Sequence, residues 1–247
     1  MEYAFHVYNR LAADGATMSL HRLLDNAYFR KKHKTRGDGT QSNANLGARA
    51  TSQATAQIDT EIGPQEDRNS AFERTKKSLC CTPVPPPIIV CVGSDLAIGD
   101  SLGPITGSML QYKTQGLNTF IYGTLSSPIT AKEIGTLRAF LRETHRDNQI
   151  LAIDAAVGDK GDIGLIKLSD TPLLPGAGAN KKLGAVGDVS IMAVVAEKSI
   201  GNYGLLNTTR LNLVYTMSEI ISDAVAALLW ERCSAKNSRL QQNACDL

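Results

Sequence analysis

Aromatic residues, histidine and excess charge are all scarce in this sequence. Its 247 residues include one tryptophan and four histidines, aromatic residues make up 5%, and the formal net charge at pH 7 is only +2. A chain so close to neutrality lacks the strong basic balance of a nucleic-acid-binding protein and the acidic balance of a solvating one. We therefore expect no nucleic-acid partner.

Cysteine is present but lacks the patterns that give it a structural role. The five cysteines form no C-x-x-C pair and show no spacing with histidine that suits zinc; they are Cys80, Cys81, Cys91, Cys233 and Cys245. Disulfide frameworks belong to small secreted domains and zinc sites need paired ligands at fixed spacing. The pattern favours a reduced, cytoplasmic setting.

Long hydrophobic runs are also missing. No segment approaches 18 consecutive apolar residues, and the first residues lack the charged-then-apolar order of a signal peptide. Hydrophobic residues nevertheless make up 43% of the chain, which is enough for the core of one sizeable domain. These features predict a soluble, cytoplasmic protein with no membrane partner.

Composition divides the chain into three parts. Residues 1–82 are expected to form an N-terminal extension, with short helices up to about residue 34 and then a flexible linker poor in large apolar residues. The basic run Arg30–Lys34 is expected to be a solvated helix end. Residues 83–233 are expected to form the folded domain, and residues 234–247 a polar, frayed tail.

Within the domain, strand-like and helix-like segments alternate. Short apolar or β-branched runs predict strands at 88–92, 119–123, 149–157, 164–168 and 189–195, and longer amphipathic stretches predict helices at 101–113, 130–146 and 205–232. Alternating strands and helices with short connections indicate an α/β fold, with a mainly parallel sheet covered by helices on both sides.

Two aspartates follow or end buried strands. Asp100 comes after the strand at 88–92, and Asp154 lies near the end of the strand at 149–157. Parallel strands bring their carboxyl ends to one edge, where two close carboxyls would share a proton and could hydrolyse a bond as an acid–base pair. The alternative is structural: Asp100 caps the following helix and Asp154 binds loop amides. Asp95 and Asp188 are further acidic candidates, with the same structural alternative.

Two other motifs are weaker. Residues 99–102 spell G-D-S-L, the signature of a lipase and esterase family in which the serine is the nucleophile, but Ser101 lacks the D-x-x-H motif that would supply its base. No histidine lies in the last hundred residues. The glycine-rich loop at 176–182 could cradle an anion, but it lacks the P-loop spacing and is better explained as a tight turn.

Five blocks together resemble the sporulation protein YyaC family of spore-forming bacteria. They are residues 93–104, 123–131, 152–158, 175–191 and 206–211, in that order, within a match over about residues 84–232. That family is related to the spore germination protease and, more remotely, to the HybD-like hydrogenase maturation endopeptidases. The resemblance implies a three-layer α/β/α fold.

The resemblance also implies a function and a site. Segments similar to those of the germination protease place its two catalytic aspartates on Asp100 and Asp154. Arg210, in the last matched block, is a further candidate for a supporting residue, together with Asp95 and Asp188. The maturation endopeptidases add a later histidine to hold a metal, and this chain has none after His145, so we expect no metal or other cofactor. We expect a peptidase acting on a small protein or peptide during sporulation or germination, in the cytoplasm or forespore. The alternative is a non-catalytic sporulation factor that binds a protein partner in the same cleft.

Overall fold

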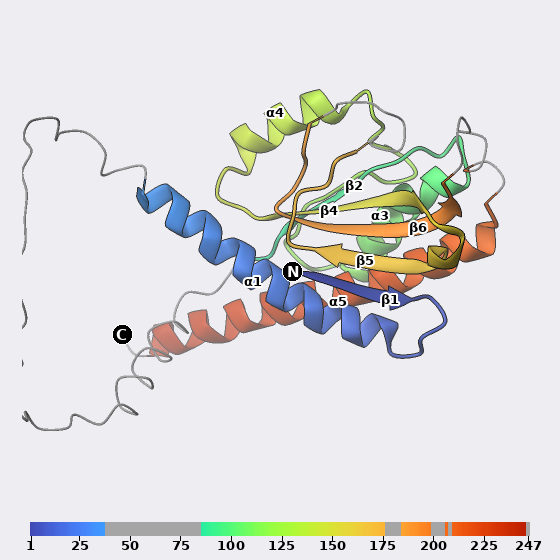
Figure 1. Ribbon diagram of the computed structural model, residues 1–247. Coiled ribbons are helices and arrows are strands. Elements are labelled where there is room, and N and C mark those ends of the chain that lie inside the picture. Colours follow the sequence, from blue (N-terminus) through green and yellow to red (C-terminus); the bar gives the residue numbers. More distant parts are fainter. Residues whose placement is uncertain (38–84, 176–183, 199–205, 207–208, 246–247) are drawn as a thin grey trace, which may run out of the picture. The chain divides into compact units, whose positions relative to one another are not determined.

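A six-stranded sheet forms the centre of the protein, with the strand order β1-β5-β6-β4-β2-β3 (Figure 1). The structure is a computed structural model that describes residues 1–37, 85–175, 184–198, 206 and 209–245. The strands are β1 (Glu2–His6), β2 (Ile88–Cys91), β3 (Ile121–Tyr122), β4 (Ile150–Gly158), β5 (Leu165–Ser169) and β6 (Val189–Glu197). The helices are α1 (Ala12–Gly37), α3 (Leu102–Lys113), α4 (Ile134–Thr144) and α5 (Leu211–Cys245), with short 3₁₀ turns η1 (Gly99–Ser101) and η2 (Lys160–Asp162).

The sheet is mainly parallel, as the alternating pattern predicts. β3, β2, β4 and β6 all run in one direction. β5 runs in the opposite direction. It follows β4 directly through the short turn η2 and pairs antiparallel with both β6 and β1. β2 consists of four consecutive apolar residues that are all buried, which is typical of a strand covered on both faces.

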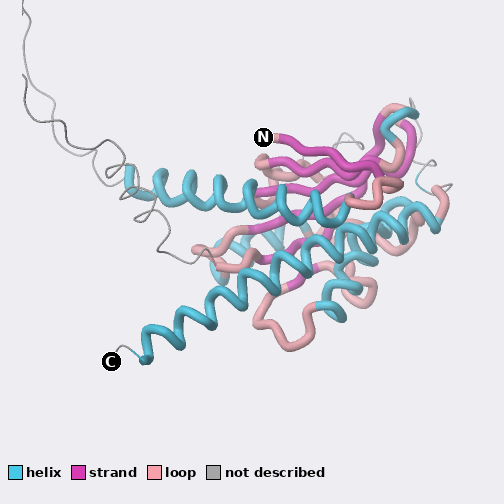
Figure 2. The backbone as a smooth tube through the Cα atoms, turned by 90° about the horizontal axis from the view of Figure 1, so that it is seen from below, coloured by secondary structure: helices cyan, strands magenta, loops and turns pink. Residues whose placement is uncertain are grey.

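Helices cover both faces of the sheet, which gives the three-layer α/β/α fold. One hydrophobic cluster joins α1, α3 and α5 to the sheet and includes Leu20, Leu24, Leu102, Leu110, Met217, Val225, Ile89, Ile153 and Ile191. A second, smaller cluster joins α4 to the other face and includes Ile134, Leu137, Leu141, Ile88, Val90 and Ala152. Figure 2 shows α1 and α5 crossing the same face of the strands.

The N-terminal residues belong to this fold, which corrects the expected domain division. The segments Met1–Lys31 and Val84–Leu247 form one compact unit. Residues 2–6 are a strand and not part of a helix: Tyr3 and Phe5 pack toward the core, and the strand pairs with β5 from Glu2↔Ser169 to His6↔Leu165. The linker expected at 35–82 lies almost wholly outside the described residues.

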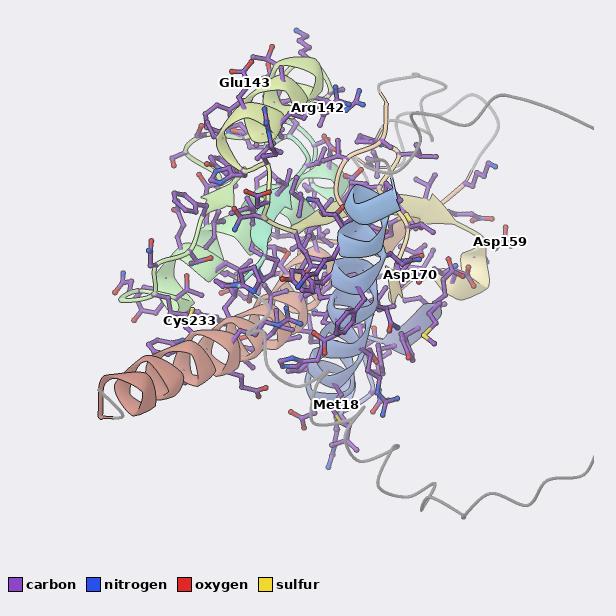
Figure 3. The ribbon with its side chains drawn as sticks, turned by 90° about the vertical axis from the view of Figure 1, so that its left-hand side faces the viewer. Met18, Arg142, Glu143, Asp159, Asp170 and Cys233 are labelled. Atoms are coloured by element: carbon purple, nitrogen blue, oxygen red, sulfur yellow. The ribbon has the colours of Figure 1, made fainter. Side chains whose placement is uncertain are left out.

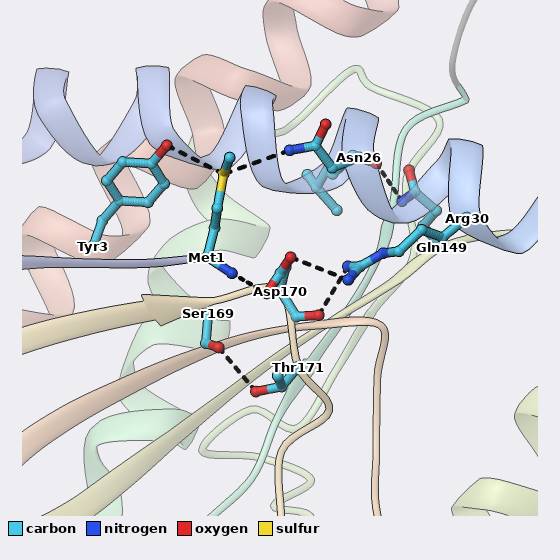
Figure 4. Close-up of polar contacts among 9 residues, drawn as sticks. Met1, Tyr3, Asn26, Arg30, Gln149, Ser169, Asp170 and Thr171 are labelled. Atoms are coloured by element: carbon cyan, nitrogen blue, oxygen red, sulfur yellow. Dashed lines mark hydrogen bonds and ion pairs between the residues drawn. The ribbon is translucent and has the colours of Figure 1, made fainter.

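Helix α1 is attached to the rest of the unit by apolar and polar contacts. Leu20, Leu23 and Leu24 are fully buried, whereas Met18 on the outer side of the helix is 62% exposed (Figure 3). The buried Gln149 donates its side-chain N–H to the carbonyl of Leu24 at 2.6 Å. Toward the C-terminal end of α1, Arg30 forms an ion pair at 3.1 Å with Asp170, which follows β5. The amino group of Met1 contacts the same carboxyl (Figure 4). These contacts make α1 an integral layer.

Helix α5 is longer than expected, and part of it is strongly apolar. It continues to Cys245, so the tail expected after Cys233 is helical over most of its length. Its part Leu211–Ser234 is long and apolar enough to span a bilayer, but 56% of its most apolar window is buried inside the protein. Residues such as Val214 and Leu228 are fully buried in the core cluster that α5 shares with α3 and the sheet, as expected for the core helix of an α/β domain.

Candidate active site

The unequal lengths of neighbouring strands create the candidate site. β2 ends at Cys91, which lies opposite Ile153 of β4. β4 continues for five more residues beside β6, to Gly158 opposite Glu197. Asp154 is the first residue of β4 beyond the end of β2. The sequence therefore places a carboxyl where one strand stops and its neighbour continues, at the carboxyl edge where α/β sheets hold their active sites.

Glycines bring the next helix against the end of β2. A β-carbon on Gly103, in the first turn of α3, would lie 1.9 Å from the carbonyl oxygen of Val92. Gly93 has a positive φ of +145°, and a β-carbon there would lie 2.1 Å from the carbonyl oxygen of Asp100. Only glycine allows backbone segments to approach this closely. As a result, η1 lies in contact with β4 and carries Asp100 toward Asp154.

The two carboxyls interact electrostatically. Burial raises the pKa of Asp154 well above its ordinary value, and the negative charge of Asp100 raises it further. Burial also raises the pKa of Asp100, but a hydrogen bond from the backbone N–H of Ser94 offsets part of that increase. The backbone N–H of Ala155 donates to Asp154 Oδ1 at 2.8 Å. Asp154 therefore holds a proton more readily than Asp100.

The structural explanation for Asp100 is not supported by the geometry. The residue before η1 is Ile98 and the residue before α3 is Ser101, and neither helix start has a side-chain capping hydrogen bond. Asp100 lies inside the 3₁₀ turn and caps neither helix. The expectation that it is an N-cap was wrong, because the chain enters α3 through a helical turn and leaves no extended residue for a cap.

The structure separates the supporting candidates. Asp95 is exposed in the loop between β2 and η1, on the same edge as Asp100. Arg210 is exposed just before α5, next to Thr209, which lies 3.0 Å from where a β-carbon of Gly99 would be. Asp188 is elsewhere: its carboxyl accepts the backbone N–H of Ile150 at 2.9 Å, at the opposite, amino end of β4. Its role there is structural.

Ser101 is not placed as a nucleophile. Its side chain is buried and donates a hydrogen bond to the carbonyl of Ile98 at 2.7 Å. His145, which is buried, contacts the hydroxyl of Tyr122 at 2.7 Å after the end of α4, where the chain returns toward the start of β4. The geometry therefore offers Ser101 no described base, and a serine esterase is disfavoured.

Other candidate features do not join this pair. The glycine-rich loop at 176–182 lies entirely outside the described residues. Among the residues that the structure describes, no three His, Cys, Asp or Glu side chains gather as a metal site. A pocket of about 370 Å³ lies between the end of α3 and the start of β3, lined by residues that include Gln111, Gln115, Phe120 and Tyr122. It belongs to the other end of these elements and does not contain the aspartates.

Sequence reasoning found the aspartates but missed the groups that differentiate them. These are the backbone N–H groups of Ser94 and Ala155, which face the two carboxyls. It also missed Leu206 and Thr209, which lie against Gly99 from the segment before α5. The signal was indirect, because Gly93 and Gly99 flank the loop and glycine in such positions indicates a close approach of backbone.

Replacing Gly103 by alanine should displace α3 from the end of β2. We expect the free energy of unfolding to fall by about 3 kcal/mol or more, because a methyl group would overlap the Val92 carbonyl. The matched control is Gly135→Ala in α4, where nothing lies within 4 Å of the added carbon. That variant should gain about 0.5–1 kcal/mol from better helix propensity. Urea unfolding measures both, and a Gly103→Ala variant as stable as the parent would contradict the close approach.

Three comparisons relate the chain to known proteins. The family described as "Protein of unknown function (DUF1256)" matches residues 65–224. "Uncharacterized protein YyaC" from Bacillus subtilis (strain 168) is 36% identical over 156 residues, which cover 63% of this chain and 74% of that protein. These matches confirm the resemblance found in the five sequence blocks. A crystal structure of the NiFe hydrogenase maturation protease HycI from Thermococcus kodakarensis KOD1 aligns with a TM-score of 0.33 and 15% identity, over 57% of this chain and 92% of that one.

Proposed function

The chain belongs to the DUF1256 family of proteins of unknown function, and we propose that it is an endopeptidase that hydrolyses a peptide bond with Asp100 and Asp154. The observation that carries the proposal is the electrostatic coupling of these two carboxyls at the carboxyl edge of the sheet. Two carboxyls that share a proton supply an acid and a base in one place. A purely structural aspartate gains nothing from a like-charged neighbour, which only makes it harder to ionise.

The pKa order assigns a role to each carboxyl. Asp154, whose pKa is raised most, enters the reaction protonated, and Asp100 enters it ionised. Asp100 removes a proton from a water molecule, the water oxygen attacks the peptide carbonyl carbon, and Asp154 gives its proton to the carbonyl oxygen. In the collapse of the resulting diol, Asp100 returns its proton to the departing nitrogen and Asp154 takes one back from a hydroxyl as the C–N bond breaks.

The partner and setting are part of the proposal. A small protein or peptide is the substrate, and no cofactor takes part. Action during sporulation or germination, in the cytoplasm or forespore, rests on the family resemblance alone. A non-catalytic factor that binds a protein partner at the same edge would keep the fold and the aspartates but cleave nothing, so a direct assay distinguishes the two functions.

The pH dependence of cleavage tests the proposal. The probe is reduced, carboxymethylated α-lactalbumin, whose alkylated cysteines keep the chain unfolded, and the products are identified by mass spectrometry. We expect a bell-shaped rate profile, because the acid limb loses the Asp100 base and the alkaline limb loses the Asp154 proton. The alkaline limb should lie well above pH 4, where an ordinary aspartate titrates.

Two further conditions sharpen the test. Activity should survive EDTA, because the proposed pair needs no metal ion. A rate that rises steadily to high pH would contradict a proton held on Asp154. Complete inertness toward this probe and toward a broad peptide library, with tight binding retained, would replace the peptidase by the binding factor.

A further inference from the structure

One edge of the sheet is formed by β1. This strand comes first in the strand order and, among the described strands, pairs only with β5 (Figure 1). It has five residues, whereas β3 at the opposite edge has two. An edge strand carries a row of backbone donors and acceptors that can pair with a further strand. The outer side of β1 is therefore a candidate interaction surface.

The backbone groups on the outer side follow from the alternation of a strand. The N–H of Val7 donates to the carbonyl of Gly164 at 2.9 Å, on the β5 side. On the same side, the carbonyl of Met1 accepts the N–H of Asp170 at 3.2 Å. Odd-numbered residues therefore bond to β5, and even-numbered residues direct their backbone groups outward. The outward-facing residues of β1 are Glu2, Ala4 and His6.

The outer backbone groups of this strand are accessible. Glu2 and Ala4 are both exposed, and no hydrogen bond reaches their outer backbone groups from any residue that the structure describes. The small side chain of Ala4 also allows another backbone to approach. The carbonyl of His6 already accepts the N–H of Asn9 at 2.8 Å, but a carbonyl oxygen has two lone pairs and can accept a second bond.

The sequence of β1 is complementary to itself when a second copy runs in the opposite direction. In an antiparallel pair centred on Ala4, which overlaps the whole strand, Glu2 lies opposite His6 of the second copy. Tyr3 then lies opposite Phe5. Opposite-charge pairs and aromatic pairs both stabilise antiparallel strands. Tyr3 and Phe5 are only half-buried against their own core, so part of each ring is left for such a contact.

We infer that the protein forms a symmetric dimer in which β1 pairs antiparallel with β1 of a second copy. Two-fold symmetry lets one short segment supply both members of each complementary pair. The two sheets continue into one another at Ala4, where the N–H of each copy bonds to the carbonyl of the other. In the strand order, β5 and β6 separate this edge from β4, which carries Asp154, so the dimer does not depend on the proposed peptidase activity.

Sedimentation equilibrium of the full chain tests the dimer. We expect the mass of a dimer for the parent protein and a dissociation constant at least roughly tenfold higher for Ala4→Pro. Proline removes the two N–H groups that bond across the symmetry axis. The pairing with β5 survives, because the N–H of Ala4 faces away from β5, and proline is tolerated at such positions of edge strands. A parent protein that stays monomeric at its highest soluble concentration would overturn the inference.

A cross-link tests the register in a variant that keeps the backbone donors. Facing residues of a hydrogen-bonded antiparallel pair have Cα atoms about 5.5 Å apart, within the range that a disulfide spans. Ala4→Cys should therefore give a covalent dimer under mild oxidation. Glu2→Cys is the matched control, because its two introduced cysteines lie four residues apart along the strands, roughly 14 Å, and should not link.

Mass spectrometry of the linked peptides separates these disulfides from any that the native cysteines form. Failure of Ala4→Cys to link, or equal linking by Glu2→Cys, would overturn the inference even if the parent protein is a dimer, because the two copies would then meet elsewhere.

Discussion

Replacement of Asp154 by asparagine should abolish peptide hydrolysis and at the same time raise the stability of the protein at neutral pH. Asparagine keeps the shape and can still accept the Ala155 N–H, but it has no proton to give to the carbonyl oxygen. Loss of a general acid or base lowers rates by about 10²–10⁴-fold. The measurements are cleavage of carboxymethylated α-lactalbumin and the midpoint of thermal unfolding.

The stability gain follows from the raised pKa of Asp154. The folded protein holds this proton more tightly than the unfolded chain, in which an aspartate titrates near pH 4. Below that pH both states are protonated and the residue carries no penalty. As the pH rises above that value, this aspartate ionises first in the unfolded chain. The folded state therefore loses stability until the pH passes the pKa of Asp154 in the folded protein. Asparagine lacks this penalty, and the gain in Tm should therefore vanish near pH 3 and grow toward neutral pH.

Two aspartate variants serve as comparisons. Asp100→Asn should also lose activity, and it should lower the pKa of the Asp154 carboxyl because a neighbouring negative charge is removed. Asp95→Asn, exposed in the same loop, should retain activity and stability. Destabilisation by Asp154→Asn at neutral pH, with cleavage unchanged, would assign both aspartates a structural role.

Truncation of Leu24 should destabilise the whole domain. This side chain is fully buried in the core cluster, so Leu24→Ala is expected to cost about 2–5 kcal/mol in the free energy of unfolding. The large expected effect follows from the position of α1 as a layer of the fold. Chemical denaturation followed by circular dichroism measures it.

The matched control lies on the same helix. Met18 is 62% exposed, and Met18→Ala should change stability by no more than about 0.5 kcal/mol. A chain that begins at residue 84 should fail to fold, because it lacks both β1 and the apolar face of α1. A stable, cooperative fold from that shortened chain would show that the N-terminal layer is dispensable.

Local patterns in the sequence predict most of the α/β core. The run Ile88–Val92 and the alternation that follows it identify every strand from β2 to β6, because buried parallel strands read as short apolar runs. Capping signals were less reliable: Asp100 has the residue type of an N-cap but lies within a 3₁₀ turn. The end of α5 was not predicted, because its last residues are polar and lack apolar residues at helical spacing.

The N-terminal strand was beyond local reasoning. β1 has five residues, and its partner β5 is distant in the sequence, so nothing near Glu2–His6 indicates pairing. In the candidate site, too, local sequence patterns identify some residues correctly and others not. Asp100 and Asp154 were found because each follows or ends a predicted strand. Asp188 comes just before the strand that begins at Val189, and the structure places it at the opposite, amino edge of the sheet.

The pairing of the first strand with β5 has a consequence for how the protein is made. Phe5 is synthesised long before its partner Ile166, which emerges roughly 8 to 30 seconds later at usual elongation rates. Throughout that interval the sheet that covers Leu20, Leu23 and Leu24 is incomplete, because β5 and β6 have not yet been made. The nascent chain thus exposes the apolar face of α1 to solvent until translation passes β6, and faster elongation or ribosome-bound chaperones shorten or shield that exposure.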